Sequence, residues 1–519
     1  MTLRRSRHSF VLVTVWFCVI ALAAVHLPMP LTGDQALYMY GAKSLAEGQA
    51  LYLDFWDAKQ PGVYLFYLLA GALFAFDGVG LHALEALWLM AAAWFAYRVG
   101  RQAIGDGLLA LLIPLLTAGT YFVAVGAWHM TQPDGLLTTP VAGVAWALSD
   151  RDFLKSERTR LFVAGAFASV AAIFKFSVLI LPLAMVATVY VLLGREVDAN
   201  RTNRCLAREL LTFLAGLLVP LAAVVIWFWL HGALSELIWT TVQYPFLALT
   251  ELDHHTYNLR LSAVWFFHMT IFWLPFALAG GIWSIQGALR RERRARPGIL
   301  MLVWLVAGLV TILMQYHYFW PFHFNQFFVP VGVLAAIGLR VMFDLLRTHL
   351  PLWRRAVVVA TMMVALLIFG YRASDQFAPL GDALAHPEGF RSAYVAKFNP
   401  RTKQIMDSVA AALAEAEPTD SIYVFGDPRF LLASGRLQAV PHNGWALEIM
   451  TTEQWRAFSS MLRTASPSYL YVSTDYIKVL TAKSPELVTW IAHEYDLHAA
   501  DAMSGGWYKR RPGKPWNQR

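Results

Sequence analysis

The chain has 519 residues, of which 58% are hydrophobic and 15% charged, and its mean hydropathy is +0.48. Soluble proteins contain about 45–50% apolar and about 25% charged residues, so this composition excludes a cytosolic globular enzyme, a disordered protein and a fibrous protein. The net charge of +8 does not by itself indicate nucleic acid, and we expect no nucleic-acid partner. Cys18 and Cys205 are far apart, which excludes a disulfide framework.

Apolar runs of helical length predict an α-helical polytopic membrane protein with about 11 transmembrane helices. The expected spans cover residues 10–27, 80–98, 107–125, 134–149, 161–174, 178–194, 210–230, 261–283, 299–314, 325–343 and 356–371. The first run lacks a clear cleavage site and is interpreted as a span rather than a signal peptide.

A further apolar run, 61–76, decides the side of every later loop. Basic residues stay on the cytoplasmic side of a membrane. If 61–76 does not span and the N-terminus is inside, the arginine cluster at 290–296 is cytoplasmic. The only basic residues outside, up to residue 371, are then Lys43, Lys59, Lys175 and Arg260. We therefore interpret 61–76 as an interfacial helix that lies along the outer surface.

This topology predicts a membrane-embedded domain, residues 1–371, and an extracytoplasmic soluble domain, residues 372–519. The second part is polar and has ordinary charge. Residues 403–415 have helical periodicity, whereas 421–425 and 469–473 have the pattern of strands. A small α/β domain fits these elements.

Polar residues concentrate in the first loop, residues 28–60. Thr32 and Gln35 have capping-box spacing, so a helix is expected to start there and to stop at Gly48. Asp34 falls in its first turn, where a carboxylate either supports the helix dipole or serves chemistry. Lys59 is either a snorkelling lysine or a ligand for an anionic headgroup or phosphate.

Two later loops are also polar at the membrane edge. Asp134 follows Pro133 at the mouth of a span, where an acid without a role or partner is costly. The last loop carries His317, His323 and Gln326 among aromatic residues. An aromatic belt explains the Trp and Tyr residues but not these polar ones. The two histidines do not share a helix face, so we predict no metal site from them.

Several of these motifs, taken in order, resemble those of C-type polytopic membrane glycosyltransferases, in particular the aminoarabinose lipid A transferases and the protein O-mannosyltransferase-like enzymes. The resemblance rests on Asp34-Gln35-Ala36-Leu37-Tyr38, Lys59-Gln60-Pro61-Gly62, Gln132-Pro133-Asp134, the hairpin around Lys175, Pro321-Phe322-His323-Phe324-Asn325-Gln326 and Val424-Phe425-Gly426-Asp427. The second carboxylate usual after the first acid is replaced here by Gln35.

The resemblance implies transfer of a sugar, with inversion, from a polyprenyl-phosphate donor to a lipid, glycan or protein acceptor at the outer face of the cytoplasmic membrane. Asp34 is then the base or an orienting carboxylate, and Asp134 is its expected partner. Lys59, His323 and His317 are expected to bind the donor phosphate, and Tyr38, Asp57 and Gln326 to contact substrate. A divalent metal ion is compatible with two close carboxylates, although no cofactor is predicted firmly.

Two other classes of function remain open. A transporter or flippase would place ionisable residues in mid-span and often has repeated halves; here only Glu85 lies in mid-span, and the sequence has no visible repeat. A non-catalytic envelope assembly factor would tolerate the loss of Asp34, Asp134 and Lys59.

Overall fold

The computed structural model describes residues 2–192, 203–252, 257–315, 319–347, 351–384, 401–501 and 505–512. The chain divides into two compact units. Unit 1 comprises Met1–Leu27, His82–Ile226 and His254–Ala385, and unit 2 comprises Pro28–Leu81, Trp227–Asp253 and His386–Arg519. Each unit is therefore built from three separate stretches of the sequence.

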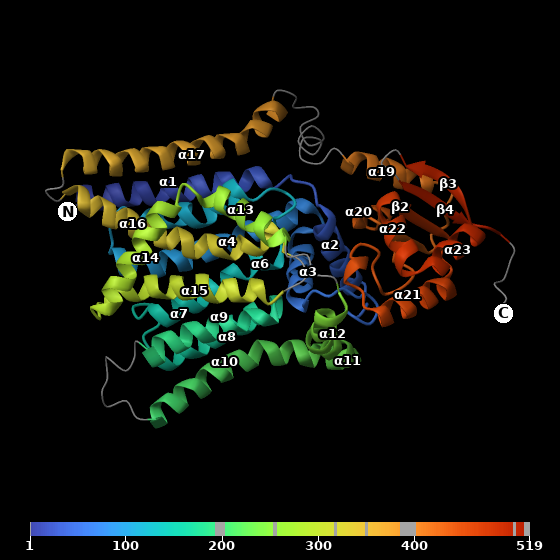
Figure 1. Ribbon diagram of the computed structural model, residues 1–519, viewed down its shortest axis with the longest axis horizontal. Helices are drawn as coiled ribbons and strands as arrows, with labels where there is room; N and C mark the ends of the chain where they lie inside the picture. The colour runs from blue at the N-terminus through green and yellow to red at the C-terminus, as the bar shows by residue number, and fades with distance from the viewer. Residues whose placement is uncertain are drawn as a thin grey trace. The chain divides into compact units, whose positions relative to one another are not determined.

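Unit 1 is a bundle of helices, several of them long and apolar (Figure 1). Its longer helices are α1 (Thr2–His26), α4 (Gly78–Ile104), α7 (Thr138–Ser149), α8 (Glu157–Phe174), α10 (Asn203–Leu230), α13 (Tyr257–Thr270), α14 (Leu274–Leu289), α15 (Arg296–Leu313), α16 (Phe328–Arg347) and α17 (Leu352–Leu384). The shorter elements are η1 (Ala110–Leu112), η2 (Leu115–Gly119), α5 (Thr120–Ala124), α6 (Pro133–Leu136), η3 (Phe176–Leu179), α9 (Ile180–Ala187), η4 (Thr188–Leu192), η6 (Arg293–Ala295) and η7 (Pro321–Phe327).

The long helices have the length and composition of membrane spans. In the described part of the chain, six are long and apolar enough to cross a bilayer, and a bent pair adds a seventh candidate. This confirms a multi-pass membrane protein, whereas the count of eleven stays a prediction. The last expected span, 356–371, lies within the longer helix α17, which continues to Leu384.

The run 261–283, expected as one span, is not one continuous helix. It is divided between α13 and α14, which meet at an angle of 92°. Pro275 lies in the first turn of α14, where its missing N–H costs nothing. The same residue inside a continuous helix would remove one hydrogen bond and clash with the preceding turn, which explains the break.

Glycine allows two helices of unit 1 to approach at backbone distance. A Cβ atom at Gly338 of α16 would overlap the carbonyl oxygen of Phe276 on α14. A Cβ atom at Gly280 of α14 would likewise overlap the carbonyl oxygen of Leu334. Small residues at such crossings are typical of tightly packed membrane helices.

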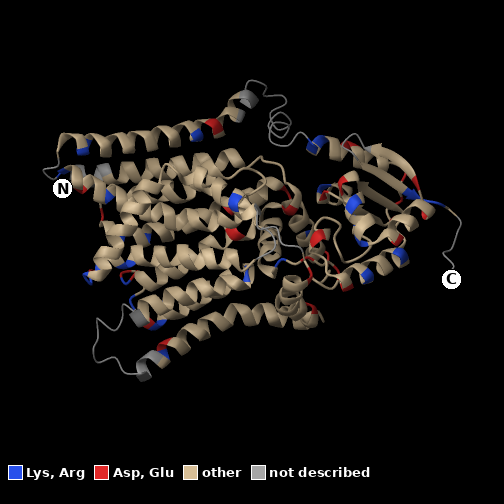
Figure 2. Cartoon of the chain, viewed as in Figure 1, with Lys and Arg blue, Asp and Glu red and all other residues tan. Residues whose placement is uncertain are grey.

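Charge is distributed unevenly along the bundle. Figure 2 shows that the long helices carry few charged residues along their middle, while many of the Lys and Arg residues of unit 1 lie near one end. This pattern agrees with helices whose central parts lie in hydrocarbon.

Unit 2 combines the first loop with the C-terminal part of the chain. Its helices are α2 (Gly33–Ala46), α3 (Pro61–Phe74), α11 (Leu234–Ile238), α12 (Tyr244–Glu251), α19 (Arg401–Ala412), α20 (Pro428–Ser434), α21 (Thr452–Ala465), α22 (Thr474–Lys483) and α23 (Pro485–Glu494), with the short turns η5 (Trp239–Gln243) and η9 (Leu447–Ile449). The helix expected at 61–76 is α3. Its interfacial position stays a prediction.

A four-stranded sheet forms the core of the C-terminal part. Its strands, in the spatial order β1-β2-β4-β3, are β1 (Ile422–Phe425), β2 (Tyr469–Ser473), β4 (Gly505–Arg510) and β3 (Tyr495–Asp501). The pair β1–β2 is parallel, and the other two pairs are antiparallel. The two strands and the helix predicted here are confirmed, and the hairpin β3–β4 was missed.

Candidate functional site

Asp134 lies in the short helix α6 of unit 1. Its side chain pairs with a lysine, Lys175, that lies 41 residues later in the sequence. Pro133 starts the helix, and Asp134 occupies its first turn. The ammonium group of Lys175, at the C-terminal end of α8, donates a hydrogen bond of 2.8 Å to Asp134 Oδ1. The side chains are 4% and 15% exposed. A nearly buried acid thus has the partner that its position requires.

A buried glutamate fixes the turn that leads into Asp134. Thr131 has a φ of +53°, a left-handed conformation that strains a β-branched residue. Its N–H donates to Glu85 Oε1 at 2.6 Å, and its hydroxyl donates to Glu85 Oε2 at 3.0 Å. The hydroxyl of Tyr121 donates to Glu85 Oε1 at 2.6 Å. Glu85 lies near the start of α4 rather than in mid-span, and it is only 1% exposed. This acid therefore has a structural role in holding the turn.

The late aromatic segment packs against the same place. Element η7 contacts α6, and Asn325 Nδ2 donates to the carbonyl of His129 at 2.9 Å. His323 Nδ1 accepts the N–H of Trp320 at 3.2 Å. Unit 1 therefore brings together two of the loops that the sequence singled out.

The other polar residues of this segment have different positions. Gln326 is fully buried and donates from Nε2 to the carbonyl of His323 at 3.2 Å. The side-chain oxygen Oε1 of Gln326 lies close to Gly308 of α15. Contacts of His323 and Gln326 with substrate stay predictions, and His317 lies outside the described residues.

Asp34 lies at the N-terminus of α2 in unit 2, as the capping pattern predicts. Thr32 is the N-cap, and its N–H donates to Gln35 Oε1 at 2.9 Å. The indole Nε1 of Trp445 donates to Asp34 Oδ1 at 2.7 Å. Within the described part of the chain, Oδ2 of Asp34 accepts no hydrogen bond. One oxygen of this half-buried carboxylate is held by the indole, and the other has no protein partner among the described residues.

Asp57 is a buried residue of the first loop, near enough to Asp34 and Lys59 for their charges to act on it. It is 2% exposed, and Oδ2 accepts a hydrogen bond of 2.6 Å from the hydroxyl of Tyr64. Burial raises the pKa of Asp57, the Lys59 charge and the Tyr64 hydroxyl act in the opposite direction, and the Asp34 carboxylate raises the pKa further. The three charges therefore share one electrostatic environment. In the described chain, Lys59 forms no ion pair.

Tyr38 belongs to an aromatic cluster that includes Tyr64, the residue whose hydroxyl bonds to Asp57. Its ring packs edge-on against Tyr64 and Tyr67, with centroids 5.7 and 5.6 Å apart. Tyr38 is 1% exposed. The cluster positions Tyr64 against Asp57, so packing accounts for Tyr38 in this structure, and its contact with substrate stays a prediction.

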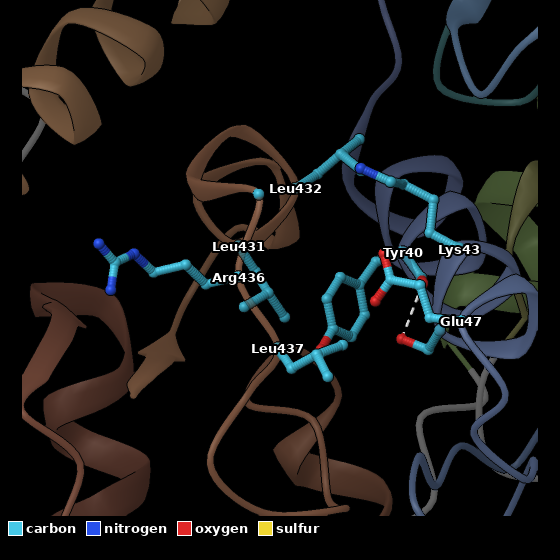
Figure 3. Close-up of a pocket in the computed structure, with 9 residues that line it drawn as sticks. Tyr40, Lys43, Glu47, Leu431, Leu432, Arg436 and Leu437 are labelled. Atoms are coloured by element: carbon cyan, nitrogen blue, oxygen red, sulfur yellow. Dashed lines mark hydrogen bonds between the residues drawn. The ribbon is translucent and has the colours of Figure 1, made fainter. Parts of the chain in front are cut away.

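A small pocket of unit 2 lies between α2 and α20, apart from these acids. Figure 3 shows its lining residues Tyr40, Lys43, Glu47, Leu431, Leu432, Arg436 and Leu437. The side chain of Arg436 points away from the pocket and donates to the carbonyl of Asp420 at 2.6 Å. The predicted site residues do not line this pocket.

The predicted site residues thus fall into two groups, one in each unit. The pairing of Asp34 with Asp134 stays a prediction. Sequence reasoning missed Trp445, Lys175 as the partner of Asp134, and Asn325 as the residue that ties two loops together. Among the described residues there is no cluster of three or more His, Cys, Asp or Glu side chains that could hold a metal ion.

Solved structures share this fold over almost the whole chain. ArnT from Cupriavidus metallidurans bound to undecaprenyl phosphate is 15% identical, with a TM-score of 0.61 over 98% of this chain and 99% of that one. The apo state of the same protein gives 14% identity and a TM-score of 0.62 over 97% and 98%. No protein-family profile and no curated protein sequence match the chain.

A third similar structure is the oligosaccharyltransferase AglB from Archaeoglobus fulgidus in complex with an inhibitory peptide and a dolichol-phosphate. It is 14% identical, with a TM-score of 0.50 over 99% of this chain and 75% of that one. These likenesses establish the fold, which is the one expected from the resemblance to C-type membrane glycosyltransferases.

Proposed function

We propose that the chain is a membrane glycosyltransferase that moves a hexose or pentose from a polyprenyl-phosphate donor to an envelope acceptor. The observation that carries the proposal is the shared fold over nearly the full length of ArnT, which was crystallised with undecaprenyl phosphate. The transporter alternative gains no support from the similar structures. The acceptor is a lipid, glycan or protein.

The first loop supplies the groups that such a transfer needs. An acceptor hydroxyl or amine attacks the anomeric carbon, and the bond from that carbon to the phosphate oxygen breaks. The acceptor proton passes to Asp34 Oδ2, the oxygen that Trp445 leaves open. The phosphate leaves with the bonding electrons, and the charge of Lys59 stabilises it. Attack from the face opposite the phosphate gives inversion at the anomeric carbon.

The remaining site residues have supporting roles in this proposal. Asp134, paired with Lys175, contributes a fixed charge beside η7. The first loop and the C-terminal part lie on the extracytoplasmic face of the cytoplasmic membrane, and the N-terminus is cytoplasmic.

A direct assay tests the proposal. Purified protein in detergent is incubated with undecaprenyl phosphates that carry aminoarabinose or a hexose, together with a membrane-lipid extract and a peptide pool. Mass spectrometry is expected to find an acceptor that has gained one pentose- or hexose-sized residue. Uptake of solute into proteoliposomes without any covalent product would instead support the transporter.

A further inference from the structure

A segment of the C-terminal part, residues 438–446, is joined to the first loop by hydrogen bonds within unit 2. The N–H of Trp56 donates to the carbonyl of Pro441 at 2.8 Å, and Asn443 Nδ2 donates to the carbonyl of Trp56 at 3.0 Å. The N–H of Gln438 donates to the hydroxyl of Tyr40 at 2.7 Å. These contacts make the segment part of the environment of Asp34.

Trp445 is the residue of this segment that reaches Asp34, and it is itself held on both sides. Its N–H donates to Asn443 Oδ1 at 3.1 Å, and its carbonyl accepts the hydroxyl of Tyr476 at 2.6 Å. Its ring packs on Gly33, where a Cβ atom would meet the six-membered ring at 2.5 Å. The absence of a Cβ atom at Gly33 therefore lets the indole approach the start of α2 closely.

We propose that Trp445 is a positioning residue that sets the orientation of the Asp34 carboxylate. A hydrogen bond from a neutral donor to a carboxylate is strong and directional. With Oδ1 held by the indole, the lone pairs of Oδ2 point in fixed directions, toward which the proton must be delivered. The inference rests on the proposed role of Asp34 as the base. It means that the C-terminal part of the chain contributes one side chain, that of Trp445, to the site.

The orientation of the Asp34 carboxylate is expected to affect the rate of transfer rather than the binding of the donor. A base must lie within hydrogen-bond reach of the proton that it removes, and small misplacements of a reacting group cost large factors in rate. Among the described residues, Lys59, the proposed phosphate ligand, forms no hydrogen bond with Trp445. Loss of the indole N–H is therefore expected to lower kcat and to leave KM for the donor unchanged.

The test compares Trp445→Phe with a matched control, Trp507→Phe. Trp507 lies in the same C-terminal part, and its Nε1 donates to Ser408 Oγ at 3.2 Å without contact to the first loop. Trp445→Phe is expected to lower kcat about tenfold or more, as loss of a hydrogen bond to a charged group does. Trp507→Phe is expected to keep the kcat of the unmodified protein. Equal kcat values for the two variants would overturn the proposal.

A second readout does not depend on turnover. Carbodiimide labelling of Asp34, measured by peptide mass spectrometry against Asp54 as internal reference, is expected to rise several-fold in Trp445→Phe and to stay unchanged in Trp507→Phe. If the unmodified protein transfers no sugar, the proposed function fails, and the labelling ratio alone decides whether Trp445 holds Asp34. An unchanged ratio contradicts the proposal whatever the activity.

A gentler variant covers the case in which Trp445→Phe does not fold. Tyr476→Phe keeps the indole but removes the hydrogen bond to the carbonyl of Trp445. It is expected to move kcat and the labelling ratio in the same directions by smaller factors. A Tyr476→Phe protein that is indistinguishable from the unmodified one in both readouts would also count against the proposal.

Discussion

The ammonium group of Lys175 lies 2.8 Å from the carboxylate of Asp134, and the two side chains are almost enclosed by protein. Both charges lie close to apolar helices, because Lys175 follows α8 and Asp134 precedes α7. Each therefore depends on the other to offset the cost of leaving water.

Removing one partner of this pair is expected to destabilise the fold strongly. Lys175→Met leaves a buried carboxylate without its cation, which costs about 3–5 kcal/mol. The double variant Lys175→Met/Asp134→Asn is expected to regain most of that loss in thermal denaturation in detergent. Arg340→Ala, which breaks an exposed pair with Asp344, serves as the control and should cost less than about 1 kcal/mol. Equal losses in the single and double variants would show that the ion pair does not matter.

Asp34→Asn is expected to remove sugar transfer while the protein still inserts and folds. The amide oxygen can still accept the indole N–H of Trp445, but the side chain no longer takes a proton. A general base contributes about 10²–10⁴-fold, so kcat should fall by that factor in the mass-spectrometric assay. Asp54→Asn, in the exposed part of the same loop, should keep its activity. Full activity in Asp34→Asn would exclude this residue from the mechanism.

Asp57 is expected to give the fold a specific pH dependence. Because its pKa is raised on folding, the folded state holds the proton more tightly, and this contribution to stability is lost as pH rises through the raised pKa. Asp57→Asn should therefore gain thermal stability relative to the unmodified protein as pH rises above about 4.

A second variant is expected to change the pH dependence of stability in the opposite direction. Tyr64→Phe removes the hydroxyl that favours ionised Asp57, so stability should fall more steeply with rising pH than in the unmodified protein. Melting temperatures measured over a pH series check both variants. Parallel curves for all three proteins would mean that Asp57 does not contribute.

Gly338→Ala is expected to separate α14 from α16. The added methyl group would overlap backbone atoms of Phe276, which cannot move aside as a flexible side chain can. Overpacking of this kind costs about 1–3 kcal/mol or more. Gly370→Ala on α17, where nothing lies within 4 Å of the added atom, is the matched control. The expected result is a lower melting temperature for Gly338→Ala alone.

Local rules account for what the sequence predicted correctly. The capping box at Thr32 and the strand at 469–473 depend on neighbours within a few residues, and both are present. The hairpin β3–β4 was missed because its strands contain His498 and Asp501 or begin with Gly505-Gly506, and so lack a clear apolar alternation.

Long-range pairs could not be predicted in the same way. Trp445 lies 411 residues from Asp34, and nothing in its own segment distinguishes it from a core tryptophan. Lys175 carried a usable signal, since a lone cation between two apolar runs needs an anion nearby, but the sequence does not say which one. The break before α14 also had a signal in Pro275, which the apolar run around it concealed.

The contacts within unit 2 restrict how the chain is threaded through a bilayer. Asp34 is bonded to Trp445, and Trp56 donates from its indole to the hydroxyl of Thr240 at 3.3 Å. Residues joined by a hydrogen bond outside the hydrocarbon lie on the same face of a membrane, so the crossings between Trp56 and Thr240 must be even in number. The N–H of Trp56 also donates to the carbonyl of Pro441, so the crossings between Thr240 and Pro441 must be even as well. A passage through the bilayer at α3, added to the expected spans, would make the first number odd and put Trp56 and Thr240 on opposite faces.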